Sequence, residues 1–427
     1  MNKTNRRDFL GVVGTGMITG LAATRFSVAQ TPGHRVQHAV IGAGGQGRGH
    51  AQAFSSFEDC DVVAICDVDP GRRESIGNRL PNNDRVVLEE DYRRILDNPD
   101  IDSVSIATPD HWHTPISLAA LEAGKHVYVE KPCSHTIYEA KLLAQAAAAS
   151  GKCVQHGTQG RSSVSIKEGI AFMRSGIIGE VRMAKAINHQ HRRPIGRTPV
   201  SDPPPGVNYD LWTGPAPAHP FTQNRWHYNW HWFWDYGAGD ISNDGIHQID
   251  QARWGLGVEI PKAVVASGGQ LYYDDDNETP DTQTVIFEYD KCHLLYEMRL
   301  WTEYPLEGHD NGVIFYGDGG RLEIGRRGCE ATLLDGEKVS FGPYASVADH
   351  IRNYLDCIKE NSPSALAAQM DDAAASTALC YLGNIATRVE RRLTLDPDTW
   401  NCIDDPEALV MYTKEYRQGY ELPGQYQ

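Results

Sequence analysis

Short apolar runs alternate with amphipathic stretches along the first third of the chain. Five apolar runs have the length and composition of strands, at 36–41, 62–66, 86–88, 103–107 and 126–129. Four stretches between and after them have helical patterns, near 46–56, 71–79, 114–123 and 136–150. Strands and helices that alternate at this spacing form βαβ units, so the pattern predicts an α/β domain with a doubly wound parallel sheet.

The pattern changes after about residue 157. Segments of strand character lie near 180–192, 262–272, 281–289, 292–300, 312–316, 320–324 and 331–334. Helical patterns lie near 162–175, 348–360 and 370–391. We therefore predict a first domain over 34–157 and a C-terminal α+β domain over 158–427, built on a large open, mostly antiparallel sheet. The back of such a sheet is a surface for self-association, so we expect a homo-oligomer, either a dimer or a tetramer.

The N-terminal segment, residues 1–29, has a composition of its own. Arg6 and Arg7 precede a mildly apolar, glycine-rich run over 11–23, and small residues end the segment at Ala29. This arrangement is typical of a bacterial twin-arginine signal peptide, with an unstructured basic terminus as the alternative. It predicts export to the periplasm by the twin-arginine machinery. The run is too short for a membrane span, and no other segment approaches the required length of about 20 apolar residues.

The first strand leads into a glycine-rich turn. Gly42, Gly44 and Gly47 form a G-x-G-x-x-G pattern, in which Gly45 and Gln46 fill the two places before the last glycine. Between a strand and a helix, such glycines allow a tight turn, a close approach of the backbone to a pyrophosphate, and close packing of helix on strand. The helix N-terminus adds free N–H groups for the phosphates. The motif predicts a Rossmann domain that binds NAD or NADP, with a turn that holds no ligand as the alternative.

A carboxylate stands at the end of the second strand. Asp67 lies twenty residues after Gly47, where it can accept hydrogen bonds from the ribose hydroxyls of adenosine. It would also repel a 2′-phosphate, which favours NAD. Arg72 and Arg73 follow closely and could hold that phosphate, so NADP stays open. Because an exported protein meets little free cofactor, we expect the nicotinamide cofactor to be tightly bound.

Two later strand ends carry further candidate cofactor contacts. Thr108, Pro109 and His113 follow the fourth strand, and Glu130 and Lys131 follow the fifth. Ligands of open α/β sheets bind outside the carboxyl ends of the strands. A lysine at this edge can lie beside a nicotinamide ring and exchange protons with a substrate. A surface salt bridge is the alternative for Lys131.

An aromatic block over 225–236 holds four tryptophans within nine residues. Aromatic faces stack on the C–H faces of sugars, and polar side chains bind the hydroxyls. Tyr228 and Trp232 are therefore candidate substrate contacts, together with His191 and Arg192 further upstream. An aromatic plug in the domain core is the alternative, and we expect most of these rings to pack.

A polar stripe follows the aromatic block. Asn243, His247 and Asp250 are spaced i, i+4 and i+7, so a helix would place them on one face. A histidine, with its unperturbed pKa near 6.5, is suited to act as a general base, and Asn243 and Asp250 are suited to bind hydroxyls. A structural histidine is the alternative for His247.

These motifs together resemble the Gfo/Idh/MocA oxidoreductases over essentially the whole chain after residue 29. The motifs that carry the resemblance are the glycine turn, Thr108–Pro109, Glu130–Lys131–Pro132 and the stretch 237–250. The resemblance implies that Lys131 and His247 are catalytic and line the substrate pocket beside the nicotinamide. It also shows a departure, because the aspartate of the family's Asp-x-x-x-His pair falls on Asn243, with Asp244 beside it.

The resemblance implies an NAD(P)-dependent oxidoreductase. Such an enzyme would transfer hydride between the nicotinamide and a secondary hydroxyl of a sugar, glycoside or cyclitol. Two alternatives stay open. One is a redox-neutral glycosidase or lyase that acts through a transient keto-sugar with retained cofactor, and the other is a non-catalytic sugar-binding protein.

The composition limits the classes of partner that the protein is expected to bind. Forty basic and 56 acidic residues give a net charge of −16, which lacks the basic footprint of a protein that binds nucleic acid. Nine cysteines are scattered without a CxxC pair, so neither a zinc ribbon nor a thioredoxin-type site is indicated. Three histidine pairs have spacings that could bind zinc, namely His111/His113, His189/His191 and His227/His231. Because no third ligand accompanies any of these pairs, we predict no metal.

Overall fold

The computed structural model describes residues 35–326, 328–344 and 346–426. The export signal predicted over 1–29 lies outside these residues. Within them, no helix is both long and apolar enough to cross a membrane. All nine cysteines fall in this part of the chain and are free thiols.

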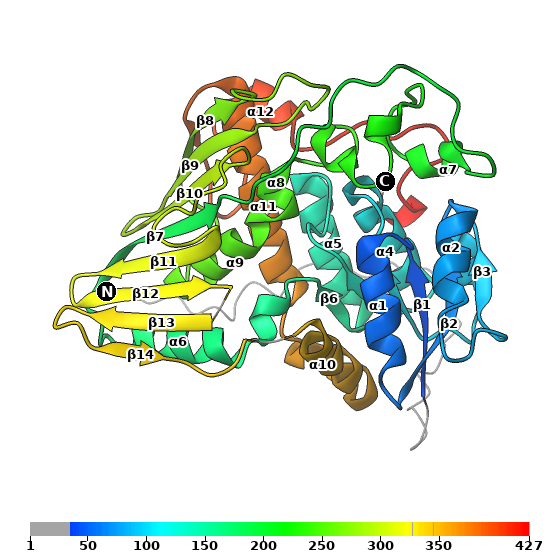
Figure 1. Ribbon diagram of the computed structural model, residues 1–427, viewed down its shortest axis with the longest axis horizontal. Helices are drawn as coiled ribbons and strands as arrows, with labels where there is room; N and C mark the ends of the chain where they lie inside the picture. Colours follow the sequence, from blue (N-terminus) through cyan, green and yellow to red (C-terminus); the bar gives the residue numbers. More distant parts are fainter. Residues whose placement is uncertain (1–34, 327, 345, 427) are drawn as a thin grey trace, which may run out of the picture. The chain divides into compact units, whose positions relative to one another are not determined.

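The N-terminal domain is built on a parallel sheet (Figure 1). Across the sheet, its strands within the described residues are β3 (Val87–Glu89), β2 (Cys60–Cys66), β1 (Val36–Ile41), β4 (Ser103–Ile106), β5 (His126–Val129) and β6 (Val154–His156). Every neighbouring pair is parallel. The strand order is that of a Rossmann fold, whose ligand crevice lies outside the carboxyl ends of the strands, where the order reverses between β1 and β4. The predicted doubly wound parallel sheet is confirmed.

Helices connect these strands. They are α1 (Gly45–Ser55), α2 (Pro70–Gly77), α3 (Tyr92–Asp97), α4 (His113–Glu122) and α5 (Ile137–Ser150). The side chains of Asp69, Asp91 and Thr136 begin α2, α3 and α5, because each accepts a hydrogen bond from a backbone N–H group of the first turn. Helix α1 starts without such a cap, so its first N–H groups stay available at the crevice.

The C-terminal domain carries a larger sheet. Across it, the strands within the described residues are β14 (Lys338–Ser340), β13 (Gly328–Leu333), β12 (Gly320–Gly325), β11 (Asn311–Gly317), β7 (Val181–Asn188), β10 (His293–Arg299), β9 (Thr282–Glu288), β8 (Ala263–Gly269) and β15 (Leu393–Thr394). Only β7 and β10 pair in parallel. The predicted large, mostly antiparallel sheet is therefore confirmed.

Helices cover one face of this sheet and separate it from the N-terminal domain (Figure 1). The helices of this part of the chain are α6 (Val164–Arg174), α7 (Tyr209–Thr213), α8 (Asp240–Asn243), α9 (Gly245–Leu256), α10 (Val347–Glu360), α11 (Met370–Val389) and α12 (Pro406–Val410). Ile246 and Ile249 of α9 are fully buried in one core with Val313 and Phe315 of β11. A Cβ at Gly255 would lie 2.2 Å from the Phe315 ring, so glycine lets α9 lie close to the strand.

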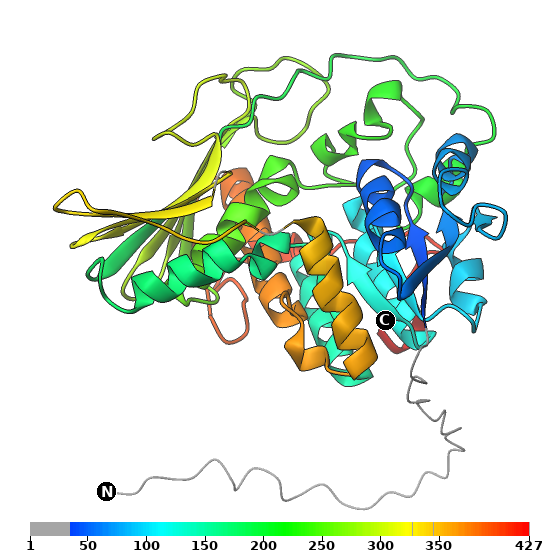
Figure 2. The same ribbon diagram turned by 60° about the horizontal axis from the view of Figure 1, so that its bottom comes forward.

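Helix α10 returns to the N-terminal domain, where both views place it beside α1 (Figures 1 and 2). Its apolar face, including Ile351 and Leu355, shares a core with Val40 and Phe54. The Tyr354 hydroxyl lies 3.2 Å from the hydroxyl of Ser103 in β4. Helix α10 therefore completes the second helical layer on the N-terminal sheet.

A long loop follows β7 and passes above the helices to the N-terminal domain (Figure 2). Asn208 anchors it there, because its N–H group donates to the carbonyl oxygen of Val68 (3.3 Å) and its Nδ2 donates to Glu90 Oε1 (2.7 Å). Val68 comes two residues after the end of β2, and Glu90 directly follows β3. The loop thus lies at the carboxyl edge of the N-terminal sheet, where the ligand crevice is.

Candidate active site

The glycine-rich turn between β1 and α1 leaves no room for a side chain at its first and last glycines. Gly42 has a φ of +91°, and a Cβ there would lie 2.6 Å from the carbonyl carbon of Ala107. A Cβ at Gly47 would lie 1.7 Å from the carbonyl oxygen of Gly42. The N–H groups of Gly45 and Gln46 lie in the uncapped first turn of α1, a position that binds phosphate well.

A cavity opens beside this turn, and we call it the dinucleotide cavity. Asp67 lines it, and its carboxylate accepts hydrogen bonds from two backbone N–H groups, at 2.6 and 2.9 Å. Burial raises the pKa of Asp67. Arg72 also lines the cavity, with Nη1 3.2 Å from where a Cβ of Gly44 would lie. Arg73 instead donates to the carbonyl oxygen of Asp67 (2.8 Å). The charged residues that line the cavity are therefore Asp67, Glu90 and Arg72.

The end of β4 forms another side of the dinucleotide cavity. Thr108 and Pro109 line it, and the buried Thr108 Oγ1 has no hydrogen-bond partner among the described residues. The ring nitrogens of His113 lie 2.6 Å from the carbonyl oxygen of Pro132 and 2.8 Å from that of Thr108, so His113 ties two strand ends together. The open turn, the carboxylate and the unpartnered hydroxyl fit a dinucleotide.

Glu130 and Lys131 follow β5 in different surroundings. Burial alone would raise the pKa of Glu130, but the hydrogen bond from His50 Nε2 (2.9 Å) and nearby positive charge lower it to about 2. Glu130 is therefore a buried anion. Lys131 Nζ donates to the carbonyl oxygen of Asn243 (2.5 Å) and to its Oδ1 (3.2 Å). Lys131 thus reaches from the N-terminal domain to the end of α8.

His247 lines a second cavity, which we call the polar cavity. Residues of α9, β11 and β12 form it, with Gln248 and Arg326 among its polar side chains. Within the described residues, the His247 ring has no hydrogen-bond partner. Burial, and then the charge of Lys131, lower the pKa of His247 to about 4. At neutral pH its imidazole is uncharged and can accept a proton.

Asn243 and Asp244 face different groups. The backbone at Asp244 has a φ of −120°, which separates α8 from α9 where the sequence predicted one helix. Asn243 holds Lys131 and donates from Nδ2 to Asp240 Oδ1 (2.8 Å). Asp244 lines the polar cavity and accepts a hydrogen bond from Arg192 (3.1 Å). The carboxylate missing at position 243 is therefore supplied to the cavity by the next residue.

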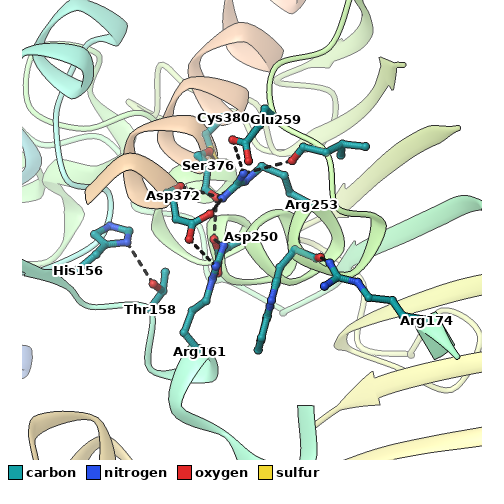
Figure 3. Close-up of polar contacts among 12 residues, drawn as sticks. His156, Thr158, Arg161, Arg174, Asp250, Arg253, Glu259, Asp372, Ser376 and Cys380 are labelled. Atoms are coloured by element: carbon teal, nitrogen blue, oxygen red, sulfur yellow. Dashed lines mark hydrogen bonds and ion pairs between the residues drawn. The ribbon is translucent and has the colours of Figure 1, made fainter. Parts of the chain in front are cut away.

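Asp250 lies in a buried network of ion pairs (Figure 3). Both of its oxygens accept hydrogen bonds from Arg161, at 2.8 Å each, and Ser376 donates to Oδ1 (2.7 Å). Arg161 and Arg253 also pair with Asp372. The network joins α9 to α11 and to the turn that precedes α6. Asp250 lines neither cavity, so we assign it a structural role in place of the expected substrate contact.

The aromatic block divides between the core and the dinucleotide cavity. Trp232 is 4% exposed and packs in the C-terminal core. Tyr228 is 54% exposed, and His191 is exposed in the loop after β7; none of these three lines either cavity. Trp226 and Trp230 line the dinucleotide cavity beside the glycine turn. Most rings pack, as expected. The two tryptophans that face a cavity face the dinucleotide cavity and not the polar cavity.

The histidine pairs with metal-ligand spacing make other contacts. His111 Nε2 lies 3.1 Å from the carbonyl oxygen of Trp212, and His227 Nε2 lies 3.5 Å from Asp69 Oδ2. Nowhere in the described residues do three or more His, Cys, Asp or Glu side chains gather in a way that could hold a metal ion.

Two family models match the chain. Residues 36–158 match the NAD-binding Rossmann fold of the oxidoreductase family, and residues 196–422 match its C-terminal alpha/beta domain. The chain belongs to the Gfo/Idh/MocA oxidoreductase family. The predicted membership of this family is therefore confirmed. The predicted nicotinamide cofactor is confirmed as a class, because the matched Rossmann fold binds NAD.

The relatives of this Gfo/Idh/MocA oxidoreductase include proteins named as glycosidases and as sugar dehydrogenases. The glycosyl hydrolase family 109 protein 1 of Shewanella sp. strain MR-4 is 30% identical over 216 residues, which cover 44% of this chain and 46% of that protein. The chain thus matches less than half the length of that relative. The structure of the aldose-aldose oxidoreductase from Caulobacter crescentus has a TM-score of 0.63 at 22% identity, and covers 85% of this chain and 100% of that chain. Levoglucosan dehydrogenase, solved with NADH and levoglucosan, has a TM-score of 0.65 at 18% identity, with coverages of 84% and 99%; these two likenesses show the fold.

Asp244, Trp226 and Arg161 are among the residues in or near the site that were not predicted. Asp244 and His247 are spaced i, i+3, which also places residues on one helical face, so that spacing was a usable signal. Trp226 belongs to the aromatic block, but no sequence pattern tells which ring faces which cavity. Arg161 lies far from Asp250 in the chain, and nothing local marks the pair.

Proposed function

We propose that this oxidoreductase transfers hydride between bound NAD and a secondary hydroxyl of a sugar, glycoside or cyclitol. The observation that carries the proposal is the placement of Lys131, whose Nζ donates to Asn243 four residues before His247, while His247 lines the polar cavity. Lys131 follows a strand end at the ligand crevice, and its charge acts on the neutral His247 in the polar cavity. The names of the two structural neighbours support a sugar as substrate. Asp67 in the dinucleotide cavity favours NAD over NADP.

The side chains divide the work of alcohol oxidation. The glycine turn and Asp67 would hold NAD, which would supply the acceptor for the hydride of the carbinol C–H bond. His247 accepts the hydroxyl proton, while Lys131 donates a hydrogen bond to the same oxygen as it becomes a ketone oxygen. The substrate loses one proton and one hydride, so two electrons leave it. Asp244, held by Arg192, accepts a hydrogen bond from a neighbouring hydroxyl and orients the sugar.

A redox-neutral glycosidase is the second candidate. The names of the glycosyl hydrolase relatives favour it. A ketone on the sugar ring acidifies the C–H bond of the neighbouring carbon, and loss of that proton expels the glycosidic oxygen as an alcohol. Addition of water and return of the hydride then give the free sugar, so no electrons leave the protein overall.

Turnover of glycosides by the protein with its bound NAD separates the two candidates. The protein is mixed with a panel of methyl and p-nitrophenyl glycosides without any external acceptor. For the dehydrogenase we expect NADH to form once per bound NAD and the reaction to resume when a second aldose is added. Release of p-nitrophenol over many turnovers without NADH would contradict that result and establish the glycosidase. If NAD-loaded protein forms no NADH and releases no p-nitrophenol with any substrate, both candidate enzymes are contradicted. That result would favour a sugar-binding protein.

The pH profile of oxidation is expected to fall near pH 4. His247 must be neutral to accept the proton, and its pKa is lowered to about 4, so kcat/KM should stay level from neutral pH down to about pH 5 and drop as the pH passes through 4. An unperturbed histidine would place the fall near pH 6.5. The measurement is kcat/KM against pH for the sugar found above, with circular dichroism at each pH to confirm that the protein is folded. A midpoint near 6.5 would remove His247 as the buried base.

Export and self-association belong to the same proposal. Residues 1–29 support transport by the twin-arginine machinery to the periplasm. The open face of the C-terminal sheet supports a homo-oligomer. Fractionation of expressing cells tests the location, and a native mass spectrum of the purified protein reports the subunit number together with the bound nucleotide.

A further inference from the structure

We infer that the C-terminal domain contributes part of the dinucleotide site, through Trp226, His227 and Trp230, and that the Trp226 N–H group donates a hydrogen bond to the bound NAD. This role rests on the NAD binding included in the proposed function, but not on the identity of the sugar. The sequence had suggested sugar stacking for the aromatic block. The structure places these three residues in the other cavity.

The first support is the lining of the dinucleotide cavity. Trp226, His227 and Trp230 line it together with Gly44 and Asp67. The polar cavity that holds His247 contains none of the three. A ligand that lies between the glycine turn and Asp67 therefore touches this segment, whereas a sugar beside His247 lies elsewhere.

The second support is an unpartnered donor. Trp226 is 3% exposed, and its Nε1 is buried without a hydrogen-bond partner in the described part of the chain. An indole N–H can only donate, and a buried donor left unpaired is costly. The ribose and phosphate oxygens of a dinucleotide are acceptors of the kind that would satisfy it. The Trp226 ring is fixed by packing on Trp212, with ring centroids 5.1 Å apart.

The third support is the attachment of the segment to the N-terminal domain. His227 Nε2 lies 3.5 Å from Asp69 Oδ2, at the start of α2. Burial, and then the charge of Arg72, lower the pKa of His227 to about 4, so the ring is neutral and close to the guanidinium that lines the cavity. Asn208 and Trp212 fasten the same loop to Glu90 and Trp112. These contacts hold the aromatic residues over the adenosine half of the crevice.

The test is NAD affinity measured by calorimetry on protein freed of nucleotide. Trp226→Phe keeps the packed ring and removes the N–H donor, so we expect the Kd for NAD to rise about 3–10-fold, the value of one hydrogen bond. ADP-ribose, which lacks the nicotinamide, is expected to lose affinity by the same factor. Trp230→Ala changes a half-buried position and is expected to speed the release of NAD, measured from the nucleotide that stays with the protein during dialysis.

Trp234→Phe is the matched control. This tryptophan belongs to the same aromatic block but lines neither cavity. The guanidinium of Arg388 lies over its ring, 4.9 Å from the ring centroid. Its NAD affinity should equal that of the unchanged protein. The inference is overturned if Trp226→Phe and Trp230→Ala both hold NAD as tightly as the unchanged protein, or if Trp234→Phe weakens binding as much as Trp226→Phe. Weaker NAD binding by Trp226→Phe in a protein that oxidises no sugar would sustain the inference and contradict the proposed function.

Discussion

The His247→Phe variant is expected to lose about 10²–10⁴-fold in kcat, the usual contribution of a general base, while its affinity for NAD stays unchanged. Phenylalanine keeps a ring of similar size but has no nitrogen to accept the hydroxyl proton. His247 lines the polar cavity and not the dinucleotide cavity, so cofactor binding has no reason to suffer. The measurement is the rate of NADH formation with a saturating sugar, next to NAD affinity by calorimetry.

His293→Phe serves as the control for this variant. His293 is an exposed histidine at the start of β10, away from both cavities, and its replacement should leave kcat within a factor of about 2, as expected for a surface position. A kcat for His247→Phe within a few-fold of the unchanged enzyme would show that another group takes the proton. Lys131 would then be the first to examine, because it donates to Asn243 and its charge acts on His247.

The Asp250→Ala variant is expected to lower the free energy of unfolding by about 3 kcal/mol, the low end of the range for breaking one partner out of a buried ion pair. Asp250 is 2% exposed and Arg161 is 6% exposed. Without Asp250, the buried guanidinium keeps the more accessible Asp372 as its carboxylate partner among the described residues. The measurement is urea unfolding at neutral pH.

Acid should erase this difference. Burial opposes ionisation, but the charge of Arg161 and its hydrogen bonds hold the pKa of the Asp250 carboxyl well below its usual range. The stabilisation is therefore fully present above the unfolded-state pKa of about 3.9 and is lost as the pH falls below it. The unchanged protein and the variant should draw closer in stability as the pH falls below about 3.9 and should converge only at still lower pH, near the folded-state pKa of Asp250.

An exposed ion pair supplies the control. Asp274 and Arg197 pair at 2.5 Å, but their side chains are 90% and 62% exposed, so Asp274→Ala should cost less than about 1 kcal/mol. The double variant Asp250→Ala/Arg161→Met should regain part of the loss, because no buried charge is then left unpaired. A double variant less stable than Asp250→Ala would show that packing, and not charge, is what the network contributes.

Regular periodicity made most of the fold predictable. The longer strands and helices have apolar positions that repeat at intervals of two or of three to four residues, and the glycine turn, Asp67 and the two later strand ends marked the crevice. Short elements were missed, among them β6 and α3, because three to six residues carry too little of a repeat. The packing of α10 on α1 joins opposite ends of the chain, and no local pattern contains it.

The site was predictable where a residue's role follows from its place on one element. His247 and Asp67 line cavities, as their positions on the polar stripe and after a strand implied, and Lys131 reaches from its strand end to Asn243. The break between α8 and α9 was not predictable, because tertiary contacts impose it. Gly239 has a φ of +71°, and a Cβ at Gly245 would lie 2.5 Å from a tyrosine hydroxyl of β10. At this break Asn243 contacts Lys131, whereas Asp244 lines the polar cavity.

Helix α10 has a consequence for the order in which the chain can fold. The core that holds Val40 and Phe54 also contains Tyr354 and Ile358, so it cannot close until α10 has been synthesised. Domains often fold during translation from the N-terminus onward, but here the nucleotide-binding domain must wait for the second half of the chain. A fragment that ends before α10 would expose this core to water and would not be an independent NAD-binding module.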